Sequence, residues 1–307
     1  AGADQGKVTR VFGANFIGRM SGKVVEAFVA KADLLAASPA YSDQSGVDWK
    51  TAAASAAKVL NHIGGVDGMD PTGWTWYCNV DDIEKLSPTE SPAEILWRGE
   101  RAKSLSLEED NFPPTLYGNG RINPTQNLVD AFPMLNGYPV SHLSGEYDEN
   151  LPYANRDPRL EAYILYNGWK AGNTNKEIFT AADGTTNDAL NKVVGRSTRT
   201  GYYLRKLLRQ DIRLDPNATA DQYHYTPRIR YTEIFLAYAE AANQAYGPQD
   251  KGGNGYSAYD VVKKLRHRAG IGRDNGDAYL ESIKNDQAKM AELIRNERRI
   301  ELCFEGF

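Results

Sequence analysis

The sequence has little cysteine: Cys78 and Cys303 are the only two among its 307 residues. They lie far apart and match no metal-ligand spacing, so two isolated thiols are favoured, with a disulfide as the alternative. No apolar run approaches the roughly 18–20 residues that a membrane helix needs. The first residues, AGADQGKVTR, lack the basic start and apolar centre of a secretory signal. We therefore expect a mature or cut chain without a membrane helix.

Histidine is also scarce, with four residues, and neither HExxH nor GxSxG occurs. The sequence therefore favours a protein that is not an enzyme and that carries no cofactor. A glycosidase-like pair of carboxylates stays an alternative, because sequence alone does not pair acidic side chains in space. Asp215, Asn217, Thr219 and Asp221 alternate as calcium ligands do, but the glycine and final glutamate of a standard loop are missing. A polar surface loop without metal is the favoured interpretation.

A basic excess is missing as well, because the net charge is -4 at pH 7. Nucleic-acid binding usually requires such an excess or a basic stripe, so we expect no nucleic-acid partner. The locally basic segment 295–301 contains acidic residues too. We expect Arg295, Glu297, Arg298 and Glu301 to form an ion-pair net on one helix.

Two blocks show the periodicity of helices with one buried face. The first block, 20–64, predicts a helical hairpin that ends at Gly64. The last block, 226–307, predicts a second hairpin plus a terminal helix. Small residues on both hairpins indicate close helix contacts and resemble degenerate tetratricopeptide units. In the first helix the expected buried face consists of Val25, Phe28, Val29, Ala32, Leu35 and Ala36.

The block between the hairpins, 65–225, is rich in glycine, proline, asparagine and aromatic residues, and turn signals such as Asn119-Gly120 recur in it. This composition predicts long ordered loops, which often carry binding sites on a rigid scaffold. A disordered insert is the alternative, and the aromatic content argues against it.

Several stretches of this chain resemble the SusD/RagB family of outer-membrane nutrient-binding proteins, in the order that the family has them. They are residues 123–132 (NPTQNLVDAF), 153–160 (YANRDPRL), 201–206 (GYYLRK), 229–241 and 295–306 (RNERRIELCFEG). The family begins with a lipoprotein cysteine and a long helical part, and it continues beyond the stretch that ends at Phe307. We therefore interpret the chain as the middle and later part of such a protein.

The resemblance implies a mainly α fold, in which 1–307 forms a single SusD-like unit with tetratricopeptide-like helix pairs supporting an irregular half. It also implies a protein on the cell surface, attached to the outer membrane through a lipid anchor. Such a protein would bind an oligosaccharide or polysaccharide and deliver it to a TonB-dependent, SusC-like transporter without catalysis. A helical docking module that has no sugar site of its own is the alternative function.

A sugar ring packs its C–H face on an aromatic ring and pairs its hydroxyls with planar polar groups. Three places in the middle block combine such residues. In an extended chain Trp74 and Trp76 would share one face. The candidate ligand-binding residues are Trp74, Trp76 and Tyr77 in the first place, Tyr117, Asn119 and Arg121 in the second, and Trp169 in the third. The alternatives are, in turn, core aromatics that anchor the loop, an ordinary turn, and the closing residues of a structural element.

Overall fold

The structure, a computed structural model, describes residues 19–86, 91–274 and 276–306. The expected mature start at Ala1 and the end at Phe307 lie outside these residues. The chain divides into two compact units. The first unit takes the described residues of Ala1–Trp74, Leu86–Glu100 and Thr226–Phe307, and the second takes Thr75–Lys85 and Arg101–Tyr225. The single 1–307 unit stays a prediction.

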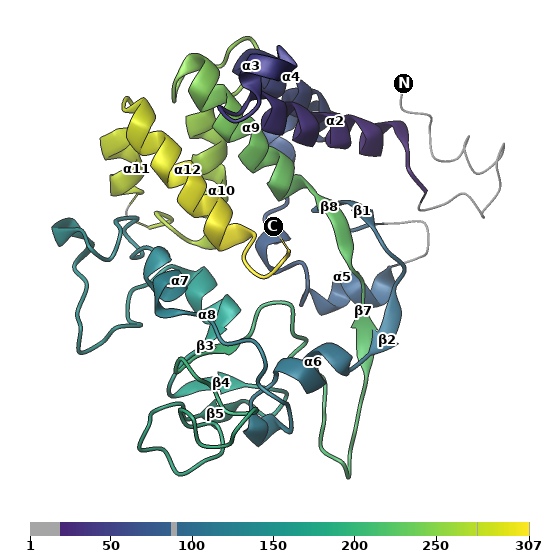
Figure 1. Ribbon diagram of the computed structural model, residues 1–307, viewed down its shortest axis with the longest axis vertical. Helices are drawn as coiled ribbons and strands as arrows, with labels where there is room; N and C mark the ends of the chain where they lie inside the picture. The colour runs from purple at the N-terminus through teal and green to yellow at the C-terminus, as the bar shows by residue number, and fades with distance from the viewer. Residues whose placement is uncertain (1–18, 87–90, 275, 307) are drawn as a thin grey trace. The chain divides into compact units, whose positions relative to one another are not determined.

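The first unit is mainly helical (Figure 1). Its strand β1 (Ile95–Arg98) pairs antiparallel with β8 (Pro227–Arg230) directly before the longest C-terminal helix. Helices lie in both blocks for which hairpins were predicted. The helices are α2 (Gly22–Ala37), α3 (Ser42–Ser45), α4 (Trp49–Leu60), α9 (Tyr231–Tyr246), α10 (Ala258–Ala269), α11 (Ala278–Ile283) and α12 (Gln287–Glu301).

Local capping explains where several of these helices begin and end. The Asp48 carboxylate accepts a hydrogen bond from the Thr51 backbone N–H at the start of α4. Ser257 and Asp260 form a reciprocal capping box at the start of α10. Gly270 ends α10 in the left-handed conformation, with φ of 110°.

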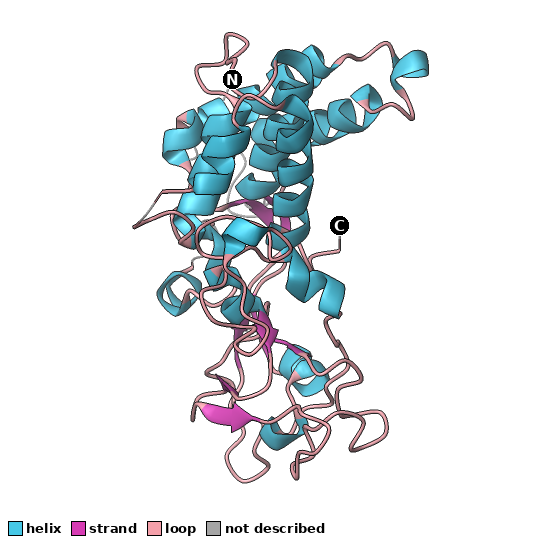
Figure 2. Ribbon diagram, turned by 90° about the vertical axis from the view of Figure 1, so that its left-hand side faces the viewer, coloured by secondary structure: helices cyan, strands magenta, loops and turns pink. Residues whose placement is uncertain are grey.

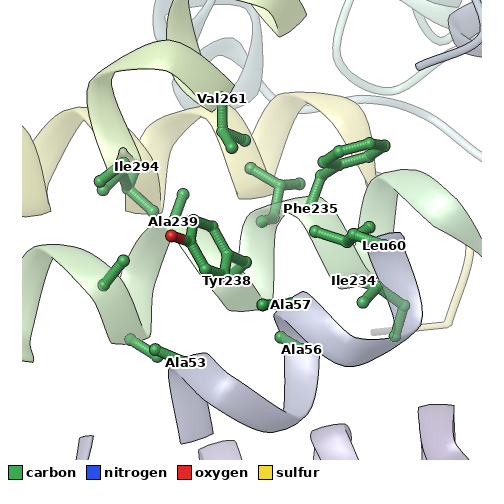
Figure 3. Close-up of a cluster of buried hydrophobic side chains, with 14 of the residues drawn as sticks. Ala53, Ala56, Ala57, Leu60, Ile234, Phe235, Tyr238, Ala239, Val261 and Ile294 are labelled. Atoms are coloured by element: carbon green, nitrogen blue, oxygen red, sulfur yellow. The ribbon is translucent and has the colours of Figure 1, made fainter. Parts of the chain in front are cut away.

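The core of the first unit forms where α4, α9, α10 and α12 meet (Figure 3). Alanines on α4, such as Ala53 and Ala56, face Ile234 and Tyr238 on α9. Small side chains let two helix backbones approach closely, so the many alanines of this sequence serve helix packing.

The expected buried face of the first helix is wrong. The structure buries Val24, Ala27, Ala30 and Ala37 of α2 instead. Val25 and Leu35 of the expected stripe are 49% and 59% exposed. Alanines permit close contact of α2 with its neighbours, whereas the larger apolar residues on the other face gave the stronger periodic signal.

The expected ion-pair net within the last helix is corrected as well, because its buried glutamates reach other elements. Glu297 and Glu301 are fully buried, where an unpaired carboxylate would be costly. The arginines that neutralise them come from α10, and Arg230 of β8 pairs with the nearby Glu305. The pairs are Arg266 with Glu297 at 2.6 Å, Arg268 with Glu301 at 2.6 Å, and Arg230 with Glu305 at 2.8 Å.

The second unit consists of short elements that long loops connect (Figure 2). A small core of Leu165, Ala171, Ile178 and Tyr203 lies between the central strands. Ordered loops were predicted for 65–225, and of this block 65–74 and the described residues of Leu86–Glu100 belong to the first unit. The helices are α5 (Val80–Lys85), α6 (Ser106–Asn111), α7 (Gln126–Ala131) and α8 (Pro158–Tyr163); the antiparallel strand pairs are β2 (Ala102–Ser104) with β7 (Gln222–His224), β3 (Ile164–Leu165) with β6 (Tyr203–Leu204), and β4 (Trp169–Ala171) with β5 (Lys176–Ile178).

The structure bears on two alternatives from the sequence, a disulfide and a calcium loop, and on the search for a membrane helix. Cys78 and Cys303 are both free thiols, so no disulfide joins them. In the described part of the chain, no group of three or more His, Cys, Asp or Glu side chains is arranged to hold a metal ion. Asp215 instead accepts a hydrogen bond from the Asn217 N–H within a polar turn. Among the described helices, none combines the length and apolar character needed to cross a membrane.

Candidate binding site in the loop-rich unit

Three aromatic rings of the second unit stack in a row, which we call the aromatic ladder: Tyr153, Tyr166 and Trp169. The Tyr153 and Tyr166 ring centroids are 3.9 Å apart, with an interplanar angle of 17°. The Tyr166 and Trp169 centroids are 5.3 Å apart, with an angle of 26°. Near-parallel stacking of this kind fixes the rings more firmly than apolar burial alone.

A tight turn positions the last two rings of the ladder. Tyr166 directly follows β3, and Trp169 is the first residue of β4. Gly168, between them, has φ of 81°, a conformation that favours glycine. The Asn167 side chain accepts hydrogen bonds from the backbone N–H groups of Thr180 and Ala181, which holds the turn against the next loop.

The two outer rings of the ladder are half-buried, whereas Tyr166 in the middle is buried. Tyr153 and Trp169 therefore keep part of their surface exposed, although the indole nitrogen of Trp169 is buried. The Tyr166 hydroxyl donates a hydrogen bond to Glu161 at 3.2 Å. Burial, together with this carboxylate, raises the pKa of Tyr166 well above its ordinary value, so the phenol stays protonated.

A chain of polar groups begins at the outer tyrosine of the ladder. The Tyr153 hydroxyl donates to the Tyr202 hydroxyl at 3.3 Å, and Tyr202 donates to Gln126 at 2.7 Å. The Gln126 amide donates in turn to Asp130 at 2.8 Å. Burial raises the pKa of Tyr202 and keeps it a hydrogen-bond donor. Gln126 and Asp130 are exposed, so the chain presents polar groups to solvent.

The predicted residues Tyr117, Asn119 and Arg121 lie on a turn attached to the same small core. Leu116 and Trp169 both pack against that core, so the turn and the ladder border one structure. Tyr117 is 53% exposed and adopts a left-handed conformation with φ of 66°. The Asn119 N–H is bound by the Glu109 carbonyl, and Arg121 pairs with Asp110 at 3.2 Å.

The predicted platform of Trp74 and Trp76 does not form in the extended conformation that the prediction assumed. Gly73–Thr75 is a 3₁₀ turn, so the two side chains do not alternate as on a strand. Trp76 and Tyr77 are each only 6% exposed. Trp76 packs beside Tyr225 with centroids 5.4 Å apart, and the Tyr77 hydroxyl donates to the Ala162 carbonyl at 3.0 Å. This burial favours anchoring of the loop. Trp74 belongs to the first unit and is half-buried.

Sequence reasoning proposed Trp169 and named Tyr166 in the same segment, with the end of a structural element as the alternative for Tyr166. It did not propose Tyr153 or Tyr202, which lie within stretches that resemble family motifs. Their assembly depends on contacts between residues far apart in sequence, which no local pattern contains.

Comparisons with known proteins find similar solved structures and one matching family. A search of curated proteins finds no match. Among solved structures, a SusD-like carbohydrate-binding protein from Bacteroides fragilis is 22% identical with a TM-score of 0.67, and the match covers 97% of this chain and 52% of that protein. A second SusD-like protein from Bacteroides fragilis is 25% identical with a TM-score of 0.65, covering 98% of this chain and 56% of the other. The chain thus spans about half the length of these structures. The SusD family matches residues 97–307, and this chain belongs to that family.

Proposed function

We propose that this chain binds an oligosaccharide or polysaccharide at the cell surface and passes it to a TonB-dependent, SusC-like transporter of the outer membrane. Membership of the SusD family supports this function, and so does the similarity to a SusD-like carbohydrate-binding protein from Bacteroides fragilis. The observation that carries the proposal is the aromatic ladder, in which the half-buried Trp169 and Tyr153 lie at the two ends of a stacked row.

The ladder would bind a glycan by stacking and hydrogen bonding without breaking a bond. The C–H face of a pyranose would pack on an exposed part of a ring. Nearby polar groups, with Gln126 and Asp130 foremost, would pair with its hydroxyls. Tyr117, Asn119 and Arg121 stand on the turn that borders the same core, and we keep them as predicted contacts. Trp74, Trp76 and Tyr77 stay predictions that their burial does not favour.

Affinity electrophoresis and calorimetry against a panel of polysaccharides test the proposal. We expect wild-type protein to bind at least one glycan and Trp169→Ala and Tyr117→Ala to bind it more weakly. Tyr41→Ala is the matched control, because Tyr41 is an exposed aromatic residue of the first unit. This variant should bind like wild type.

Three other outcomes would point elsewhere. If no glycan binds, the proposal fails and the helical docking module becomes the better interpretation. If purified protein releases reducing ends from the glycan, the glycoside hydrolase is favoured. If both site variants bind like wild type, glycan binding survives but the aromatic ladder and the Tyr117 turn are not where it occurs.

A further inference from the structure

The first unit contains a pocket of about 610 Å³, formed by three segments. The turn after α4 contributes residues 61–67, the loop before α10 contributes residues 251–256, and α10 contributes one face. Pockets that hold small molecules usually have volumes of about 300–1,000 Å³, so this one has room for one or two sugar rings.

Two glycines border the open side of the pocket, and the ring of Tyr256 forms its base. A Cβ atom built on Gly64 or Gly255 would meet no atom within 4 Å, so both border open space. Gly65 lies against the Tyr256 ring, where an added Cβ would come within 2.7 Å of the ring. Tyr256 is buried, and its backbone carbonyl accepts a hydrogen bond from the Tyr238 hydroxyl at 2.6 Å. The base of the pocket is therefore part of the core of the first unit.

One face of α10 supplies most of the charge. Asp260, Lys263, Lys264 and His267 line the pocket and follow the i, i+3, i+4, i+7 spacing of a single helix face. Lys251 adds a further ammonium group from the loop. The pocket thus gathers cationic side chains from two segments.

The charged side chains of this pocket differ in whether they already have a partner within the protein. The Asp260 carboxylate accepts hydrogen bonds from the Ser257 N–H and hydroxyl, both at 2.9 Å. Lys263 lies 3.9 Å from a Glu281 oxygen outside the pocket lining. Over the residues that the structure describes, Lys251 and Lys264 have no ion-pair partner. These two ammonium groups are the ones available to a ligand.

We propose that this pocket binds a saccharide that carries one negative charge, such as a uronate. The three lysines and two aspartates that line the pocket together leave one positive charge. Lys251 and Lys264 would hold the carboxylate, and Asp67 would accept hydrogen bonds from hydroxyl groups. Asp67 also opposes a ligand with several negative charges, because like charges repel in a confined site.

The proposal is independent of the aromatic ladder, because every residue of this pocket belongs to the first unit. A neutral glycan that binds only through the ladder would leave the pocket empty. An acidic saccharide would bind the pocket even in a Trp169→Ala variant. The two proposals can therefore fail separately.

A titration of the 307-residue chain with galacturonosyl-galactose, a disaccharide with one carboxylate, followed by amide NMR and calorimetry, tests the pocket. We expect shifts at the amides of Gly64, Gly65 and Gly255. The double variant Lys251→Gln, Lys264→Gln should bind at least about tenfold more weakly, equivalent to about 1.4 kcal/mol. Lys23→Gln with Lys50→Gln removes the same charge from exposed positions on α2 and α4 and should leave binding unchanged.

Two further ligands and one variant test the class of ligand. A neutral digalactoside should bind the pocket at least about tenfold more weakly than galacturonosyl-galactose. A polysulfated disaccharide should also bind weakly to wild type but gain affinity in Asp67→Asn, which lacks the opposing charge. The proposal is overturned if galacturonosyl-galactose does not bind, if the double variant binds it normally, or if the neutral or polysulfated sugar binds equally well.

Discussion

Arg268 and Glu301 form a charge pair inside the first unit. Arg268 Nη2 lies 2.6 Å from Glu301 Oε1, and at most 2% of either side chain is exposed. Arg268 also donates to the Thr232 hydroxyl at 2.7 Å and to the Asp70 carbonyl at 3.0 Å. The pair therefore joins α12 to α10, to the start of α9 and to the loop that contains Asp70.

Replacing one member of this pair should destabilise the protein. Glu301→Gln leaves the Arg268 charge buried with less compensation, and breaking a buried pair costs about 3–5 kcal/mol. Urea unfolding measures the loss. Glu292→Gln is the control, because Glu292 lies on the same helix but is exposed, and its effect should stay within about 0.5 kcal/mol. Equal losses in both variants would contradict a special role for the buried pair.

The two faces of α2 should respond differently to substitution. Ala27 is fully buried, so Ala27→Leu should cost about 1–3 kcal/mol by overpacking the contact between helices. Val29 is exposed, so Val29→Ser should change the free energy of unfolding by no more than about 0.5 kcal/mol. If the Val29 variant loses more stability than the Ala27 variant, the face expected from the sequence is the buried one after all.

The α2 helix shows which parts of the fold the sequence could predict. Its existence followed from hydrophobic periodicity, because that signal is local. Its buried face did not, because Ala27 and Ala30 are weakly hydrophobic and only their packing partners make them core residues. The glutamates of α12 follow the same rule: Glu297 and Glu301 could be predicted to pair, but their partners on α10 could not.

The candidate site shows the same limit. Trp169 stood out because it follows an Asn-Gly turn within an aromatic segment. Tyr153 joins it only because the chain returns to the same place, so composition gave no sign of a stack. Trp76 and Tyr77 looked equally suitable in sequence, and their burial against Tyr225 and Ala162 depends on segments far along the chain.

The imidazole of His224 should make stability depend on pH. Burial acts to lower the pKa of His224, but hydrogen bonds to the buried Glu108 carboxylate and to the Gln222 carbonyl outweigh it and raise the pKa, against a smaller opposing effect of Arg209. Since the folded value lies above that of the unfolded chain, about 6.5, protonated His224 stabilises the fold fully below that pH. This contribution is lost as pH rises through the folded pKa.

Unfolding measured between pH 5.5 and 8.5 tests this dependence. The stability of wild type relative to His224→Gln should be greatest at the acidic end and should decline as pH rises. His62→Gln provides a comparison at an exposed histidine that pairs with Glu26 in the first unit. A constant difference between wild type and His224→Gln across this range would show that the imidazole does not titrate in the folded protein.

Two substitutions at Tyr153 separate stacking from hydrogen bonding in the aromatic ladder. Tyr153→Ala removes the ring that lies 3.9 Å from Tyr166. Loss of the stacking contact between this ring and the sugar should cost about 0.5–1.5 kcal/mol, which is roughly a two- to tenfold loss of glycan affinity. Tyr153→Phe keeps the ring and removes only the hydroxyl that bonds Tyr202 at 3.3 Å, so affinity should stay within about twofold of wild type. Calorimetry with the glycan found in the panel measures both. If the Phe variant loses as much as the Ala variant, the hydroxyl chain toward Gln126, and not the ring, makes the contact.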